Sequence, residues 1–128
     1  MGFAYPTALG AKVAAPDRPV VCISGDGGFL FNSQEMATAM QYGIHVVVGV
    51  FNDNAYGNVY RDQLNKYDGR VIASQLQNPD FVQLAKSYGM DAVRINEPNE
   101  LEIELSKAID KNRSCLIEVS VGMMPSPW

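Results

Sequence analysis

The sequence predicts a three-layer α/β/α fold with a mainly parallel sheet. Two apolar runs, 20–24 and 46–51, read as strands without a polar face, which is typical of parallel strands that helices cover on both sides. Between them, Met36 and Met40 recur at helical spacing, and Gly43 stands where a helix often ends. A strand, a helix and a second strand in this order predict the βαβ unit from which parallel sheets are built.

The residues before this unit predict a helix and a tight turn. Residues 2–15 are small and apolar with little charge, as expected for a closely packed helix. Pro16 and Pro19 then restrict the backbone, and the residues before them are biased away from helix. We therefore expect a turn at 16–19 and a strand over Val20–Ser24.

The middle of the chain continues the alternation of strands and helices. The helix of the βαβ unit is expected over Asn32–Tyr42 and the second strand over Val46–Phe51. The polar segment Ala55–Tyr67 predicts a helix that is either a solvated face or a lid over a site, and its pattern fits both. Asp68–Gln77 lacks periodicity and predicts a mobile connection, whereas Asn-Pro-Asp at 78–80 predicts a helix start.

The last third of the chain predicts two strands and a helix. Asp91–Ile95 and Ser114–Val121 read as strands, and a helix is expected to begin near Glu97 between them. The tail at 123–128 is expected to be irregular and to dock on a neighbouring subunit. Because no linker or repeat divides the sequence, residues 1–128 are expected to form a single domain.

Composition argues against several classes of function. The 128 residues carry a formal net charge of −4, and their 10 Lys and Arg residues are scattered, so we expect no nucleic acid partner. No apolar run approaches the roughly 20 residues that span a bilayer, and no signal peptide pattern is present, so we expect no membrane and a cytoplasmic location. Cys22 and Cys115 lie in apolar runs and are expected to be reduced and buried.

Polar residues end both strands of the βαβ unit. Asp-Gly-Gly at 26–28 follows the first strand, and Asn-Asp-Asn at 52–54 follows the second. The carboxyl ends of parallel strands meet at one edge of a sheet, so Asp26 and Asp53 are expected to lie close together. Carboxylate and carbonyl oxygens are the ligands that Mg²⁺ takes, often together with phosphate oxygens. We predict a site for Mg²⁺ and a diphosphate, with a simple helix N-cap as the alternative role of Asp26.

The pairing of these motifs resembles a known family. From Asp26 to Asn52 the interval is 52 − 26 = 26 residues, and a Gly-Asp-Gly motif with an Asn-rich pair at this distance resembles the signature of thiamine diphosphate (ThDP) enzymes. The interval matches the acetolactate synthase, pyruvate oxidase and benzoylformate decarboxylase branch. Flanking segments 1–14 and 78–95 resemble the same branch, so the likeness covers nearly the whole chain, as expected for the C-terminal, diphosphate-binding domain.

The resemblance assigns roles to individual residues. It implies that Asp26 and Asp53 bind Mg²⁺ through their side chains and Ala55 through its backbone carbonyl. Met1 stands where the family contacts the pyrimidine ring of the cofactor, with a start codon as the alternative. The backbone around the remaining cofactor-binding residues would hold the diphosphate: Gly25, Gly27, Gly28, Tyr56, Gly57 and Asn58.

Two departures from the family pattern bear on function. The family usually has Asn where Asp53 stands, so this site carries one more negative charge and should depend more strictly on the metal. Asn58 and Asp62 occupy positions where branched-chain biosynthetic members typically carry Met and Trp. We therefore expect an acetolactate synthase-like enzyme, a lyase or transferase that decarboxylates or ligates a 2-oxo acid, without a named substrate.

The resemblance also implies what lies outside this chain. In the family, a Glu from a pyrimidine-binding domain, usually of another subunit, promotes proton loss from the cofactor. No segment here resembles that domain, so we assign no catalytic residue, expect the isolated chain to be inactive, and expect a homo-oligomer such as a dimer. We also expect a fragment whose sheet is incomplete because it lacks its first strand and helix. The alternatives are a non-catalytic binding or assembly module and another α/β phosphate-binding domain.

Overall fold

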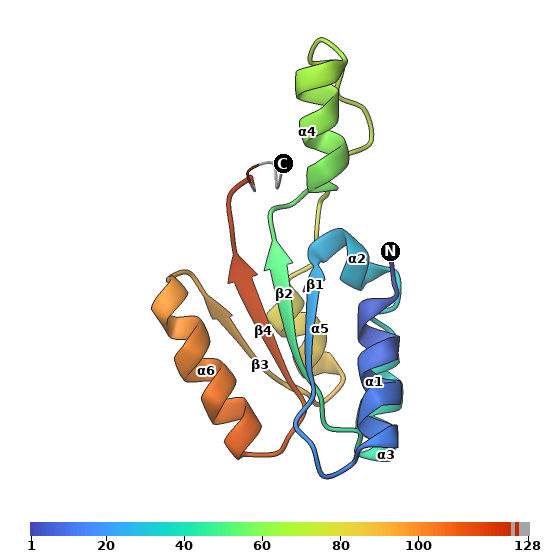
Figure 1. The fold of residues 1–128 in the computed structure, drawn as a ribbon, viewed down its shortest axis with the longest axis vertical. Helices are drawn as coiled ribbons and strands as arrows, with labels where there is room; N and C mark the ends of the chain where they lie inside the picture. Colours follow the sequence, from blue (N-terminus) through green and yellow to red (C-terminus); the bar gives the residue numbers. More distant parts are fainter. Residues whose placement is uncertain (124, 126–128) are drawn as a thin grey trace.

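A computed structural model of the chain describes residues 1–123 and residue 125. Its centre is a parallel sheet of four strands in the order β1-β2-β4-β3 (Figure 1). The strands are β1 (Val21–Gly25), β2 (Val47–Asn52), β3 (Asp91–Ile95) and β4 (Cys115–Ser120). The helices are α1 (Ala4–Ala14), α2 (Asp26–Leu30), α3 (Glu35–Tyr42), α4 (Gly57–Lys66), α5 (Phe81–Ser87) and α6 (Pro98–Asp110). The predicted α/β fold with a parallel sheet is confirmed, whereas most of the predicted tail, at 124 and 126–128, lies outside the described residues.

Helices cover both faces of the sheet. One face packs against α1, α2, α3 and α5 through a core that includes Phe29, Met36 and Phe81, all at most 1% exposed. The opposite face packs against α6, where Ala108 meets Ile117. Figure 1 shows α6 on one side of the strands and α1 with α3 on the other. These are the three layers that the sequence predicts.

The prediction that β1 is covered on both faces is wrong. Its residues alternate, so that Cys22 is buried in the core while Ile23 is 70% exposed. The reason is the position of α6, which packs over β2, β4 and β3 and leaves the outer face of β1 uncovered among the described residues. By contrast, Val47–Val50 of β2 are buried on both faces, as predicted.

Two predicted helices have different bounds in the structure. The segment expected as a helix over Asn32–Tyr42 becomes helical only at Glu35, and a separate helix, α2, follows β1 directly. Gly43 ends α3 in the left-handed conformation, at φ +62°, as predicted. The polar helix expected over Ala55–Tyr67 is α4, which has no buried residue and projects from the body of the fold (Figure 1).

The connection at 68–77, predicted to be mobile, is hydrogen-bonded to the rest of the fold through Ser74 and Leu76. Tyr56 N–H donates to the carbonyl of Ser74, and Leu76 N–H donates to the carbonyl of Asn54, both at 2.8 Å. These bonds tie residues 74–76 to the segment that follows β2, which the lack of periodicity in the sequence does not predict. None of the described helices combines the length and apolar character that crossing a membrane requires.

Candidate functional site

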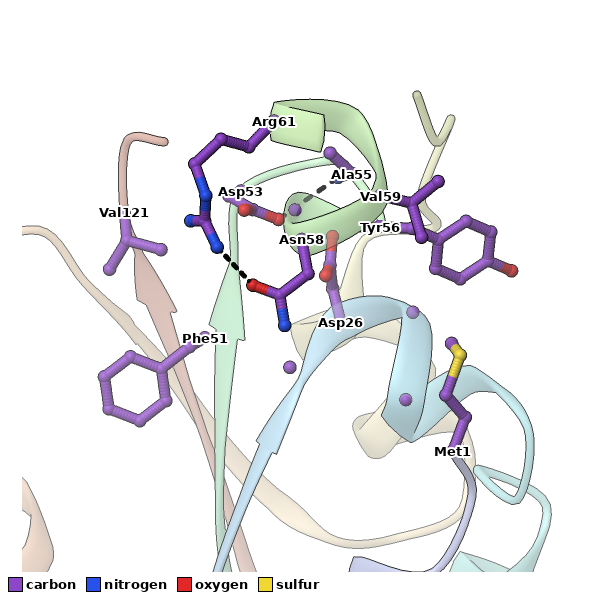
Figure 2. A pocket seen from close by; sticks show the side chains of 14 residues that line it. Met1, Asp26, Phe51, Asp53, Ala55, Tyr56, Asn58, Val59, Arg61 and Val121 are labelled. Atoms are coloured by element: carbon purple, nitrogen blue, oxygen red, sulfur yellow. Dashed lines mark hydrogen bonds between the residues drawn. The ribbon is translucent and has the colours of Figure 1, made fainter. Parts of the chain in front are cut away.

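A pocket of about 430 Å³ lies at the carboxyl edge of the sheet. It opens between the end of β2 and the starts of α2 and α4, as the sequence predicts for a parallel sheet (Figure 2). Its lining includes all ten residues predicted to bind the cofactor: Met1, Gly25, Asp26, Gly27, Gly28, Asp53, Ala55, Tyr56, Gly57 and Asn58. It also includes Phe51, Val59, Arg61 and Val121, which the sequence does not single out. The structure thus brings the predicted set together around one cavity.

Asp26 is a buried carboxylate at the floor of this pocket. It is the first residue of α2, only 2% exposed, and its Oδ2 accepts a hydrogen bond of 2.6 Å from Asn78 Nδ2. The N-cap of α2 is Gly25, so the alternative that Asp26 serves as the N-cap is wrong. Burial of a carboxylate is costly unless it is paired or binds a cation. The position therefore favours a role in binding.

Asp53 lies beside Asp26 at the end of β2. Its Oδ1 accepts the backbone N–H of Ala55 at 3.2 Å. Burial, followed by the negative charge of Asp26, raises the pKa of the Asp53 carboxyl. The charge of Asp26 therefore disfavours the charged form of Asp53, and a bound cation would reverse this effect.

The backbone after β2 turns sharply to form the pocket wall. Asn54 adopts the left-handed conformation, at φ +55°, which Asn tolerates better than most residues. Its N–H donates to Asn52 Oδ1 at 3.2 Å, so the Asn52 side chain closes the turn. This turn places Asp53 and Ala55 on the pocket lining while Asn52 points away from it.

The glycines of the two motifs serve different purposes. A Cβ atom at Gly27 would lie 2.5 Å from Tyr56 Cε1, and one at Gly57 would lie 2.6 Å from Asp53 Oδ2. Gly27 therefore lacks room for a side chain because the Tyr56 ring packs against it, whereas a Cβ at Gly57 would displace the Asp53 carboxylate. A Cβ at Gly25 would meet nothing within 4 Å, so this backbone faces open space that a ligand can occupy.

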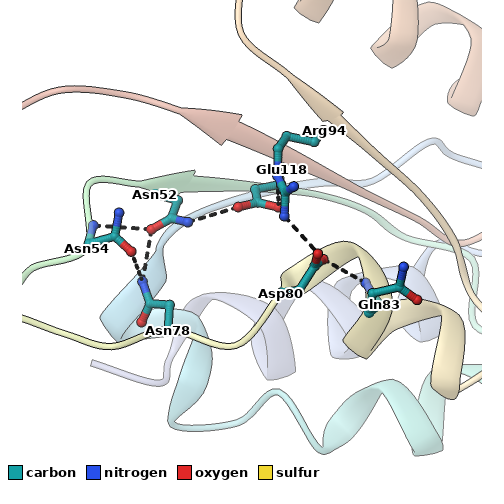
Figure 3. A network of polar contacts seen from close by, with 7 residues as sticks. All are labelled: Asn52, Asn54, Asn78, Asp80, Gln83, Arg94 and Glu118. Atoms are coloured by element: carbon teal, nitrogen blue, oxygen red, sulfur yellow. Dashed lines mark hydrogen bonds and ion pairs between the residues drawn. The ribbon is translucent and has the colours of Figure 1, made fainter.

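A chain of polar side chains behind the pocket was not predicted from the sequence (Figure 3). Asn52 Nδ2 donates to Glu118 Oε1 at 2.8 Å, and Arg94 Nε donates to Glu118 Oε2 at 2.8 Å. Glu118 is 2% exposed although it lies in the middle of the apolar strand β4. A lone acidic residue in an apolar run is the only signal that the sequence offers for Glu118, and the sequence pattern places Asn78 only at a helix start.

The donor set fits a hard divalent cation held partly by its ligand. Among residues 1–123 and 125, no group of three or more His, Cys, Asp or Glu side chains could hold a metal ion. The pocket instead offers Asp26 and Asp53, with backbone groups around them. Mg²⁺ is commonly bound by one or two carboxylates, and phosphate oxygens and water complete its shell. The residues present fit that arrangement.

Comparisons with known proteins agree with this chemistry. A sequence model of the family described as "Thiamine pyrophosphate enzyme, C-terminal TPP binding domain" matches residues 1–119. The chain is 43% identical over 122 residues to a probable acetolactate synthase large subunit of Methanococcus aeolicus, covering 94% of this chain and 20% of the relative. It is also 43% identical over 125 residues to acetolactate synthase isozyme 3 large subunit of Escherichia coli K12, covering 94% of this chain and 22% of that protein.

A solved structure confirms the fold. The ThDP-dependent 4-hydroxybenzoylformate decarboxylase of Rhodococcus jostii RHA1 matches with a TM-score of 0.89 and 29% identity. The match covers 98% of this chain and 24% of the decarboxylase chain. This chain therefore spans about a fifth of the length of the curated relatives described above.

Proposed function

This chain belongs to the family of C-terminal, thiamine pyrophosphate-binding domains of thiamine pyrophosphate enzymes, and on that premise we propose that its pocket holds the Mg²⁺-diphosphate end of this cofactor, also called ThDP. The observation that carries the proposal is the buried Asp26 beside Asp53 in a pocket whose Gly25 backbone faces open space. Asp26 and Asp53 would bind the metal through their side chains, and Ala55 through its carbonyl. The diphosphate would lie against the backbone of Gly25 and of the α4 start at Gly57.

The remaining lining residues suit the organic part of the cofactor. Met1, Phe51 and Val121 add apolar side chains to the pocket lining around the two carboxylates. Bound there, ThDP would supply a carbanion centre and an electron sink for chemistry at a substrate carbonyl. The chain's own contribution is to hold the charged end and to restrict water around the apolar part. Asn58 and Arg61 join at the pocket lining through a 2.6 Å hydrogen bond from Arg61 Nη2 to Asn58 Oδ1.

For the whole enzyme we propose an acetolactate synthase-like reaction on a 2-oxo acid, with decarboxylation, carboligation or both. The names of the acetolactate synthase relatives support this class. The substrate is left open because Asp62, at the family's selective Trp position, pairs with Lys66 at 3.0 Å and is not part of the described pocket lining.

The site also requires a partner domain. Among the described lining residues the only carboxylates are Asp26 and Asp53, and both are committed to the metal in this proposal. A group that assists proton loss at the other end of the cofactor must come from elsewhere. We propose that it comes from a pyrimidine-binding domain of the same enzyme, carried by a second subunit of a homo-oligomer such as a dimer.

The test is a calorimetric titration of ThDP into the enzyme that contains this domain, in Mg²⁺ and in EDTA. Binding is expected with Mg²⁺ and not with EDTA, because the two carboxylates repel the diphosphate without the metal. Asp26→Ala is expected to lose binding in both conditions. The matched control is Asp62→Ala, which removes a half-exposed carboxylate of α4 and should bind as the wild type does. Equal affinity in Mg²⁺ and EDTA would sink the proposal.

A further inference from the structure

Asn78 joins the two segments that carry the acidic residues. Its side-chain Nδ2 donates to Asp26 Oδ2 at 2.6 Å and to Asn52 Oδ1 at 2.9 Å, and it lies 3.5 Å from Asn54 Oδ1. Asp26 follows β1, whereas Asn52 and Asn54 belong to the end of β2 and the turn after it. A single amide group, contributed by the segment before α5, therefore bonds to both strand ends. Figure 3 shows Asn78 pointing at Asn52 and Asn54.

Glu118, which does not line the pocket, fixes the orientation of the Asn52 and Asn78 side-chain amides. Glu118, paired with Arg94, is a buried carboxylate and can only accept hydrogen bonds. Asn52 must therefore turn its Nδ2 toward Glu118, which it does at 2.8 Å. Its Oδ1 then faces Asn78, and only the Nδ2 of Asn78 can meet that oxygen. Each amide thus fixes the orientation of the next.

The surroundings of the Asn78 carbonyl oxygen also bear on the orientation of this amide. Oδ1 of Asn78 is buried and has no hydrogen-bond partner among the described residues. Leaving a buried acceptor unpaired destabilises a fold, but a reversed amide would aim that oxygen at the oxygens of Asp26 and Asn52, which is worse. In the observed orientation, Nδ2 of Asn78 donates to both Asp26 and Asn52. The bond to Asp26 is charge-assisted, which is the stronger kind.

We propose that Asn78, oriented by Glu118 through Asn52, is a positioning residue that occupies Oδ2 of Asp26 and holds the 52–54 turn against it. Oδ1 of Asp26 is thereby left for the metal, and Asp53 is set beside it before the metal binds. The inference rests on the proposed function, since it concerns the same metal site. Neither Asn78 nor Glu118 lines the pocket, so both act through other residues.

The experiment uses the enzyme that contains this domain and compares three variants by calorimetry with Mg²⁺ and ThDP. Asn78→Leu keeps the volume of the side chain and removes the donor. Glu118→Gln keeps the shape of the buried group and removes its acceptor-only character. Gln77→Leu, at the exposed neighbour of Asn78, is the matched control. Circular dichroism and thermal unfolding without cofactor show whether each variant folds.

We expect Asn78→Leu and Glu118→Gln to weaken Mg²⁺-dependent ThDP binding by about 10–100-fold, as the loss of groups behind metal ligands generally does. We expect Gln77→Leu to match the wild type. The double variant of Asn78 and Glu118 should bind no more weakly than Asn78→Leu alone, because both act through one chain of bonds. A purely structural role would lower the unfolding temperature and leave the affinity of the folded protein unchanged.

The possible outcomes distinguish a failure of the proposed cofactor site from a failure of the positioning role of Asn78. If the wild type itself binds ThDP equally with Mg²⁺ and with EDTA, the proposed function fails. If the wild type needs Mg²⁺ but folded Asn78→Leu binds with wild-type affinity, the positioning role is overturned. If Asn78→Leu does not fold, Glu118→Gln decides, and wild-type affinity in that variant overturns the proposal.

Discussion

Gly25 and Gly27 flank Asp26 in the sequence. Replacing each by alanine is expected to affect stability and cofactor affinity in opposite ways. A Cβ at Gly27 would lie 2.5 and 2.7 Å from two ring atoms of Tyr56 and 3.0 Å from Leu76 Cδ1. Overpacking of this kind costs about 1–3 kcal/mol. Because Gly27 lies inside α2, alanine also restores about 0.5–1 kcal/mol of helix stability. The difference between these two terms is about 0–2.5 kcal/mol, and we expect Gly27→Ala to lower the free energy of unfolding by about 1 kcal/mol.

Gly25 supplies the matched comparison. Its backbone, at φ −74° and ψ 158°, suits alanine, and a Cβ there would meet nothing within 4 Å. Gly25→Ala should therefore leave the unliganded protein as stable as the wild type or about 0.4–1 kcal/mol more stable. The new methyl group would occupy space that the cofactor needs, so ThDP affinity should fall at least ~10-fold, or ~1.4 kcal/mol.

The assay is urea unfolding of both variants without cofactor, followed by calorimetry with Mg²⁺ and ThDP. Unfolding reports the packing at Gly27, and calorimetry reports the open space at Gly25. Equal unfolding free energies for the two variants would refute the packing argument. Undiminished ThDP affinity in Gly25→Ala would refute the assignment of this space to the cofactor.

Three further predictions concern the metal site, the thiols and the isolated chain. Asp53→Asn should keep ThDP binding but change the Mg²⁺ concentration needed for half-saturation. Asp53→Leu should lose binding. An unchanged Mg²⁺ titration in the Leu variant would show that Asp53 is not a ligand. Burial raises the pKa of the Cys22 and Cys115 thiols to about 11, so iodoacetamide at pH 8 should label the native protein roughly 100-fold more slowly than the urea-unfolded protein. Equal labelling rates, measured by mass spectrometry, would contradict the burial of Cys22 and the partial burial of Cys115. The chain alone should not accelerate exchange of the cofactor's C2 proton for deuterium, followed by NMR, because no further carboxylate lines the described pocket; clear acceleration would indicate an internal base, with Glu35 the first residue to replace.

The parts of the fold that local sequence determines were predictable. Apolar runs and a helical stripe between them define the βαβ unit, and a glycine ends α3 where predicted. The acidic residues at the two strand ends lie on one pocket because parallel strands share their carboxyl edge. Register alone aligns Gly25 with Phe51, which places the first motif beside the second.

The parts that depend on distant contacts were not predictable. Asn78 bonds to Asp26 across 52 residues, and Asn52 bonds to Glu118 across 66 residues. Periodicity carries no information on such pairs. The exposed face of β1 was missed for a related reason, since an apolar run indicates burial but not whether α6 extends far enough to cover it.

The most direct test of the account is to locate the metal. Crystals of the enzyme with ThDP and Mn²⁺ in place of Mg²⁺ would show the ion by its anomalous scattering. One peak is expected in the pocket, within bonding distance of an oxygen of Asp26, an oxygen of Asp53, the carbonyl of Ala55 and the diphosphate. A peak away from Asp26, or a ThDP molecule bound in this pocket with no metal beside it, would contradict the account.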